Sequence, residues 1–110
     1  MQVMRLFYHP DKKDISLPGV LYALGDPIRL EIVRHLATQG EQPCAVVCDA
    51  LAIAIAKSTM SHHFRVLREA GITYSRKEGT QHINSIRRED LDACFPGLLN
   101  TVLGCMAKTT

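Results

Sequence analysis

The sequence of 110 residues has no uncharged apolar run long enough to cross a lipid bilayer. The longest such run covers residues 50–56, whereas a transmembrane helix needs roughly 20 apolar residues. The first ten residues also lack the apolar core of a secretory signal peptide. We therefore expect a protein of the cytoplasm that has no membrane partner.

The residue sets that enzymes and metal sites need are also missing. The sequence has no glycine-rich phosphate loop, no evident carboxylate pair and no complete set of metal ligands. His62 and His63 are adjacent, and on a helix their side chains would point about 100° apart, so they cannot chelate one metal together. We expect neither catalysis nor a cofactor.

A disulfide framework is not expected either. The four cysteines would stay reduced in the cytoplasm, and 110 residues can bury one core without disulfides or metals. Apolar residues make up 46% of the chain and charged residues 22%, which is typical of one globular domain spanning residues 1–110. Positive charge is concentrated, because residues 57–88 carry a net +5 and the rest sums to −3. A basic segment of this kind suggests a polyanionic partner, and a merely solvated helix face is the alternative.

Hydrophobic periodicity predicts three helices in the first half of the chain, after an N-terminal arm at residues 1–14. The first covers residues 15–24 and ends at Gly25. The second begins after Asp26, a good N-cap, with Pro27 in its first turn, and repeats apolar residues every four positions. A short extended piece at Cys44 precedes the third helix, at about residues 46–54, which is apolar nearly all round and should be buried.

A fourth helix is expected to begin with Ser58 as its N-cap and to end at Gly71. Its apolar stripe leaves small polar and basic side chains on the opposite face. Two helices joined by a short turn, at residues 46–70, predict a helix-turn-helix whose second helix reads the major groove. Two β-prone segments around Glu78-Gly79 then predict a hairpin at residues 72–86, a basic wing for the DNA backbone. The residues expected to contact DNA are Lys57, Ser58, Thr59, Ser61, His62, His63, Arg65, Arg68, Arg76 and Lys77. For His63, packing within the domain is the alternative to contact with a phosphate.

The last segment, residues 89–108, has helical spacing of apolar residues and a bend or break at Pro96-Gly97. So small a domain has little core left for this helix. It is therefore expected to pair, together with the first helix, with a second copy of the chain, and packing within one subunit is the alternative. The predicted fold is mainly α with a β-hairpin wing, about five helices, and a homodimer through the first and last of them. The expected interface residues are Val20, Leu21, Leu98, Leu99, Val102 and Met106.

Three stretches, in order, resemble the ArsR/SmtB family of small bacterial winged-helix repressors. They are ALGDPIRLEIVRHLA, KSTMSHHFRVLREAGI and SRKEGTQHINSIRREDL, and the resemblance covers about residues 15–106. It implies a homodimer that blocks a promoter by binding double-stranded operator DNA and that is often released by a small inducer. A winged-helix module for protein contacts, without DNA specificity, is the alternative function.

Arsenic-sensing members of this family carry a Cys-Val-Cys-Asp-Leu stretch before the recognition helix. Allowing one extra residue in the turn, Cys48-Asp49 match its second half, but Val46 replaces the first cysteine. Cys44 precedes Cys48 by four residues, so a helical turn would bring both thiols together for a soft metalloid or metal, and an extended backbone would separate them.

Cys94 and Cys105 would share a face on an unbroken helix, but Pro96-Gly97 disrupts that geometry. Sensing of a metalloid or an oxidant by thiols, and inert packing of all four cysteines, remain alternatives. No histidine follows His82 and no cysteine precedes Cys44, so the last-helix and N-terminal metal sites of other members are not expected.

Overall fold

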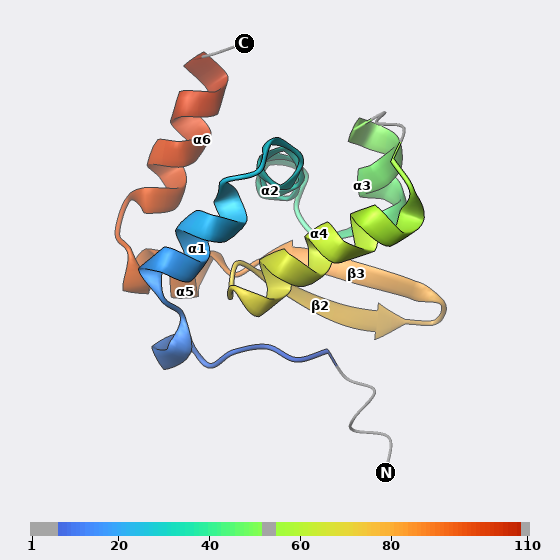
Figure 1. The fold of residues 1–110 in the computed structure, drawn as a ribbon, viewed down its shortest axis with the longest axis horizontal. Coiled ribbons are helices and arrows are strands. Elements are labelled where there is room, and N and C mark those ends of the chain that lie inside the picture. The colour runs from blue at the N-terminus through green and yellow to red at the C-terminus, as the bar shows by residue number, and fades with distance from the viewer. Residues whose placement is uncertain (1–6, 52–54, 109–110) are drawn as a thin grey trace.

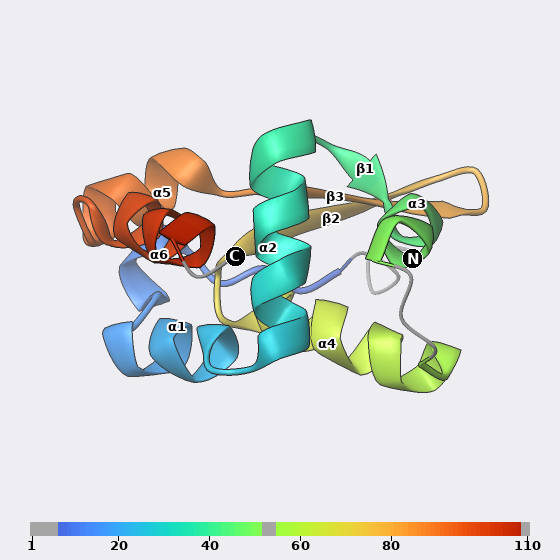
Figure 2. The same cartoon turned by 90° about the horizontal axis from the view of Figure 1, so that it is seen from above.

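The computed structural model describes residues 7–51 and 55–108, which form six α-helices and a three-stranded antiparallel sheet (Figures 1 and 2). A 3₁₀ turn, η2 (Lys12–Asp14), precedes the first helix. The helices are α1 (Leu17–Leu24), α2 (Pro27–Gln39), α3 (Cys44–Leu51), α4 (Lys57–Glu69), α5 (Arg88–Cys94) and α6 (Leu98–Lys108). The strands are β1 (Gln42–Pro43), β2 (Thr73–Glu78) and β3 (Gln81–Ile86), in the order β1-β3-β2.

The elements divide the molecule into two ends. Both views place α1, α5 and α6 at one end, and α3 and the turn of the β2–β3 hairpin at the other (Figures 1 and 2). The hairpin pairs Thr73 with Ile86 and Glu78 with Gln81. The predicted fold, mainly α with a hairpin wing, is confirmed.

Local chemistry explains where several helices begin and end. The Asp26 carboxylate accepts hydrogen bonds from the backbone N–H groups of Ile28 (2.8 Å) and Arg29 (3.1 Å), which confirms it as the N-cap of α2. Gly71 follows α4 with φ +86°, and its N–H donates to the Arg68 carbonyl. This left-handed glycine ends α4 and turns the chain into β2, as expected.

Three expected helix starts and one expected burial are wrong. Helix α1 begins at Leu17 rather than at residue 15, because Ser16 is its N-cap. Helix α3 begins at Cys44, because the extended piece lies before this residue, in β1. This edge strand has two residues, which is too short for an alternating pattern to show in the sequence. Ser58 lies inside α4, and Ala56 takes the N-cap position with no side-chain cap, so burial of Met60 fixes this helix rather than a hydroxyl. Ala50 is exposed rather than buried, and residues 52–54 of the expected third helix lie outside the described residues.

The expected interruption at Pro96-Gly97 is confirmed and divides the last segment into two helices. Helix α5 ends at Cys94, Gly97 has φ +83°, and α6 begins at Leu98. No helix in the described ranges has the length and apolarity of a membrane span.

The core lies where α1, α2 and α4 pack together, and α3, α5 and α6 each add one buried residue, Val47, Leu91 and Leu99. It includes Ile32, Val33 and Leu36 from α2, and Phe64 and Leu67 from α4. Because α4 gives one side to this core, its opposite side is free to meet a partner.

Candidate nucleic-acid interface

The exposed face of α4 carries small polar and basic side chains. Met60, Phe64 and Leu67 are 6%, 4% and 0% exposed, which confirms the predicted buried stripe. The Arg65 guanidinium lies 3.1 Å from Nδ1 of His62, one helical turn away. The exposed residues of this face are Lys57, Ser58, Thr59, Ser61, His62 and Arg65.

The structure removes His63 from this face. Its side chain is 7% exposed, and its Nδ1 lies 3.2 Å from the Arg29 guanidinium. Arg29 also donates to the carbonyl oxygens of Ala23 (2.6 Å) and Tyr22 (3.3 Å) at the end of α1. Burial lowers the pKa of His63 most, Asp26 opposes this and Arg29 adds to it. His63 is therefore a neutral link between α4 and α2, and the expectation that it contacts DNA is corrected.

Arg68 is only half exposed. Its guanidinium lies 4.6 Å from the centre of the Phe7 ring, and its buried Nε has no hydrogen-bond partner within the described ranges. Burial is the main cause that lowers the pKa of Arg68. This cation lies beside the α4 face rather than on it.

The two wing cations have different surroundings. Arg76 pairs with Glu41 at 2.8 Å and with Glu78 at 3.3 Å, whereas the part of the chain that the structure describes shows no ion pair to the exposed Lys77. The hydrogen bond that Arg76 donates to the Glu41 carboxylate is the main cause that raises the pKa of Arg76. Lys77 is thus the cation of the wing that is available to a phosphate.

A groove of about 360 Å³ separates α4 from the hairpin. The sequence pointed to its α4 side, but not to Phe7, Ser75, His82 or Asn84, which reach it from the arm and the strands. No short-range pattern marks these residues, because contacts distant in sequence bring them together. The groove is lined by Phe7, Cys44, Ser58, Ser61, His62, Phe64, Arg65, Arg68, Ser75, His82 and Asn84.

Comparison with known proteins agrees with this geometry. A model described as a helix-turn-helix domain matches residues 24–73. The transcriptional regulator YceK of Bacillus subtilis is 37% identical over 84 residues, which cover 76% of this chain and 82% of that protein. The arsenical resistance operon repressor of Staphylococcus xylosus is 38% identical over 97 residues, covering 84% and 89%. The chain belongs to the ArsR-type family of winged helix-turn-helix DNA-binding transcriptional regulators.

A solved relative of this ArsR-type regulator supports the same assignment. It is a homodimeric winged helix-turn-helix DNA-binding domain from Mycobacterium bovis, 30% identical to this chain. The two superpose with a TM-score of 0.63 over 78% of this chain and 76% of the other.

Two of the cysteines of this ArsR-type chain share a cavity. Cys44 and Cys48 lie one turn apart on α3 and line a space of about 630 Å³ between α3, α4 and the hairpin turn. Asn84 Nδ2 donates to Cys44 Sγ (3.0 Å), and Ser75 donates to Asn84 Oδ1 (2.7 Å). Burial is the main cause that raises the pKa of both thiols, and beside Cys48 the Asp49 carboxylate adds to it. Both shifts favour the protonated thiol over the thiolate.

The other two cysteines lie on different helices. Cys94, at the end of α5, donates to the carbonyl oxygen of Lys12 (3.7 Å), and Cys105 is exposed on α6. The residues that the structure describes contain no group of three or more His, Cys, Asp or Glu side chains that could hold a metal ion.

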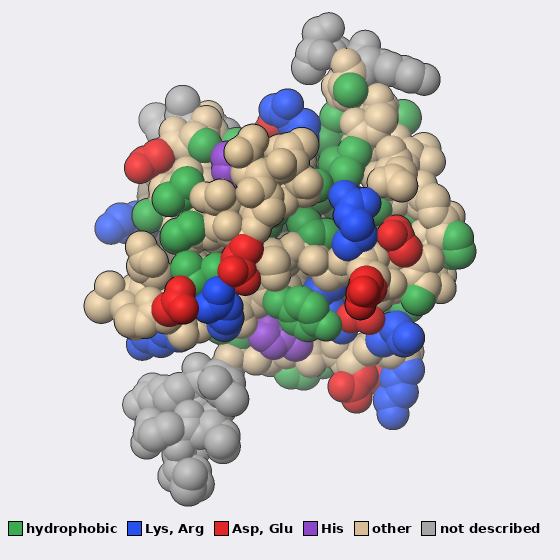
Figure 3. Space-filling view, turned by 180° about the vertical axis from the view of Figure 1, so that it is seen from behind, with side chains coloured by type: hydrophobic (Ala, Val, Ile, Leu, Met, Phe, Trp, Pro, Cys, Tyr) green, Lys and Arg blue, Asp and Glu red, His purple; other side chains and the backbone are tan. Residues whose placement is uncertain are grey.

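The residues expected at a dimer interface fall into two classes. Val20 and Leu99 are 1% and 3% exposed within one subunit and belong to its core. The expectation that these two residues lie at a dimer interface is therefore corrected. Leu21 is 50% exposed on α1, and Leu98, Val102 and Met106 are half-buried on α6. Seen from behind, hydrophobic side chains reach the surface beside α6 (Figure 3).

Proposed function

We propose that this ArsR-type regulator represses transcription by binding operator DNA as a homodimer, in the cytoplasm and without catalytic activity. Helix α4 enters the major groove, and Lys77 on the hairpin contacts the adjacent backbone. The observation that supports this most directly is the exposed face of α4, because its side chains make no contribution to the core. The DNA contacts proposed are the six exposed α4 residues, Arg68 and Lys77, with Arg76 available when its acidic partners release it.

The homodimer is proposed from α1 and α6. Leu17 and Leu21 leave apolar surface on α1, at the same end of the molecule as α6. A homodimer has also been described for the relative from Mycobacterium bovis. A two-fold pair would present two copies of α4 to the two halves of a palindromic operator.

We also propose release by a small inducer, since the similar protein from Staphylococcus xylosus is an arsenical resistance operon repressor. The Cys44–Cys48 pair is the candidate site for a soft metalloid, because both thiols face one cavity. Inert packing of these thiols is the alternative, favoured by their raised pKa values.

The experiment is a binding titration with an operator selected by the protein from a pool of random duplexes. His62→Ala should weaken operator binding by about 1–3 kcal/mol and random-DNA binding much less, because base contacts specify sequence. Lys77→Ala should weaken both about equally and reduce the salt slope by about one unit, because a backbone contact releases counterions. Fluorescence anisotropy over a range of salt concentrations measures both effects.

The rival function, a winged-helix module for protein contacts, gives a different result. Such a module would show no selected operator and no steep fall of log affinity with log salt. If His62→Ala instead weakens operator and random DNA alike, that side chain contacts backbone, and specificity belongs to the hydroxyl side chains of α4 or to DNA shape.

A further inference from the structure

The strand order β1-β3-β2 leaves one edge of β2 without a strand partner. The described part of the N-terminal arm, from residue 7 onward, lies along this edge (Figure 1). The backbone N–H of Ser75, in β2, donates to Nε2 of His9 at 2.9 Å. A side chain of the arm thus takes a hydrogen bond that a further strand would otherwise accept.

Two residues earlier, the arm bridges the recognition helix and the wing. The Phe7 ring packs edge-on against His82 of β3, with ring centres 4.9 Å apart and planes at 78°. The Arg68 guanidinium of α4 lies 4.6 Å from the centre of the same ring. Arg68 has no ion pair within the described residues, so this aromatic face is the group that lies directly against its guanidinium.

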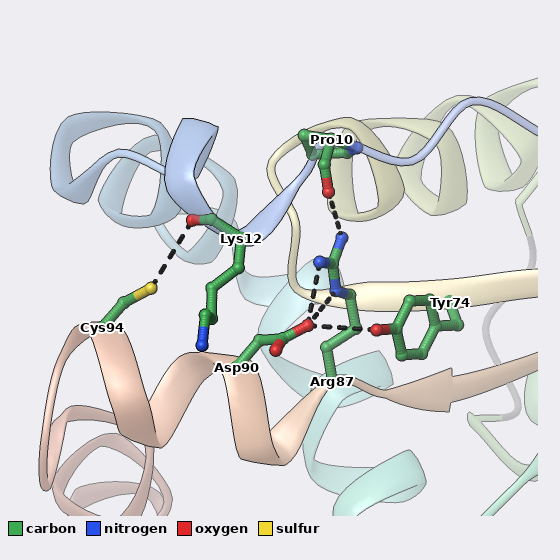
Figure 4. Close-up of polar contacts among 6 residues, drawn as sticks. All are labelled: Pro10, Lys12, Tyr74, Arg87, Asp90 and Cys94. Carbon is green, nitrogen blue, oxygen red and sulfur yellow. Dashed lines mark hydrogen bonds and ion pairs between the residues drawn. The ribbon is translucent and has the colours of Figure 1, made fainter.

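One residue after His9, the arm is held by Arg87, which follows β3 and is the N-cap residue of α5. The Pro10 carbonyl oxygen accepts a hydrogen bond from the buried Arg87 guanidinium at 2.8 Å (Figure 4). Arg87 also donates twice to Asp90 at 3.0 and 2.9 Å, and the Tyr74 hydroxyl donates to the same carboxylate oxygen. The arm is therefore tied to α4, β2, β3 and the start of α5 through three of four successive residues.

The bond from Ser75 requires a neutral His9, because a protonated imidazole has no lone pair at Nε2. Burial, and then the charges of Arg68 and Arg87, lower the pKa of His9. The charged and titratable side chains around this ring are Arg68 of α4, Tyr74 of β2, Arg87, and the Asp90 carboxylate bonded to the last two. In a protonated His9, the Nε2–H group would face the backbone N–H of Ser75, so that two donors would meet. The imidazolium would also be a third positive charge beside Arg68 and Arg87.

We propose that residues 7–10 form a strap that positions Arg68 and the wing for DNA, and that the strap holds only while His9 is neutral. Phe7 and His9 are then positioning residues, which act through Arg68 and β2 rather than through contact with DNA. This inference rests on the proposed function, since it assumes that α4 and the hairpin bind one DNA duplex. It predicts that affinity for the operator falls on acidification through loss of the strap.

The first test replaces the aromatic ring. Phe7→Ala should weaken operator binding roughly 3- to 30-fold, since the cation then loses the ring that orients it. Phe7→Tyr keeps a ring and should restore wild-type affinity. Tyr8→Ala is the matched control, because Tyr8 is 63% exposed and adjacent in the arm. Equal affinities for Phe7→Ala and Tyr8→Ala would overturn the proposal.

The second test uses pH. Wild-type protein and His9→Gln, in which an uncharged amide oxygen can accept from Ser75, are titrated with operator between pH 7.5 and pH 5.5, on the order of one unit either side of the usual histidine pKa. Protonation of the other histidines affects both proteins, so only the difference between them reports His9. We expect the wild type to lose several-fold more affinity than His9→Gln. Identical pH profiles would contradict the strap.

A readout without DNA separates this inference from the proposed function. The protection factor of the Ser75 amide, in which the intrinsic pH dependence of hydrogen exchange is divided out, should be high in the wild type at neutral pH and should fall in His9→Ala and at low pH. Fast exchange in the wild type would refute the strap even if DNA binds. If the wild type selects no duplex although the Ser75 amide is protected, the proposed function and the role of the strap in DNA binding are both refuted. The contact between residues 7–10 and the hairpin would then stand as a structural feature without that role.

Discussion

Gly71 joins the recognition helix to the wing in a conformation that a side chain would strain. Its φ is +86°, and a Cβ there would lie 2.5 Å from Cγ1 and 2.7 Å from Cδ1 of the buried Ile15. Gly71→Ala combines left-handed strain with overpacking, so we expect a loss of about 2–4 kcal/mol of unfolding free energy. Denaturation by urea, followed by circular dichroism, measures it.

Two other glycines are matched controls for this substitution. Gly79 has φ +63° and no atom of the described residues within 4 Å of its Cβ position, so Gly79→Ala should cost only the strain, about 1–2 kcal/mol. Gly104 lies inside α6, has no atom of the described residues within 4 Å of its Cβ position and has no positive φ. Because alanine favours a helix over glycine, Gly104→Ala should raise the unfolding free energy by about 0.5–1 kcal/mol. A Gly71→Ala loss no larger than that of Gly79→Ala would show that Ile15 moves aside freely.

The two adjacent histidines show what periodicity can resolve at the scale of one residue. His63 is three residues after Met60 and four before Leu67, so the helical repeat that predicts the buried stripe also includes His63. That signal was present in the sequence. The polar partner of the buried His63 ring is Arg29, which is 34 residues away in the sequence, and no local pattern indicates such a contact.

At the scale of elements, amphipathic helices and the hairpin could be predicted, because their repeats and turn glycines are local. The two-residue β1 could not, since its only determinant is pairing with β3, Gln42 with Asn84 and Pro43 with Ile83. This pairing also brings the start of α3 close to the wing. It therefore decided the question that the sequence left open, whether Cys44 and Cys48 share a helical turn.

Helix α3 gives these two thiols low reactivity. Both have raised pKa values through burial, whereas Cys105 is exposed on α6. We expect iodoacetamide at neutral pH to label Cys105 before Cys44 and Cys48, because only the thiolate reacts. Peptide mass spectrometry along the time course measures the order, and early labelling of Cys44 would contradict its burial.

Arsenite then distinguishes a sensor pair from inert thiols. A sensor pair predicts release of operator from the wild type and from Cys94→Ser/Cys105→Ser, but not from Cys44→Ser/Cys48→Ser. Release that persists in the last variant would move the site to the other two cysteines, and no release from any variant would favour inert packing.

For the whole molecule, the sequence could predict the winged-helix fold, because its motifs follow one another in order. It could not predict how the arm returns to β2, since the bond from Ser75 to His9 spans 66 residues. Nor could it separate core residues from residues of the proposed dimer interface at the end of the molecule where α1 and α6 lie. Val20 and Leu21 are neighbours in one apolar helix, yet one is 1% and the other 50% exposed.

That difference selects the substitutions that test the dimer. Leu17 and Leu21 are 44% and 50% exposed on α1, so charges there should disrupt a subunit contact without opening the core, which Leu98 would risk. Leu17→Glu/Leu21→Glu should sediment as a folded monomer at micromolar concentration and bind operator at least tenfold more weakly, because two half-sites must be held together. Val46→Glu is the control, since Val46 is equally exposed, at 44%, but lies on α3 at the opposite end (Figure 1). It should remain dimeric, and a wild type that sediments as a folded monomer would show that α1 and α6 do not form this interface.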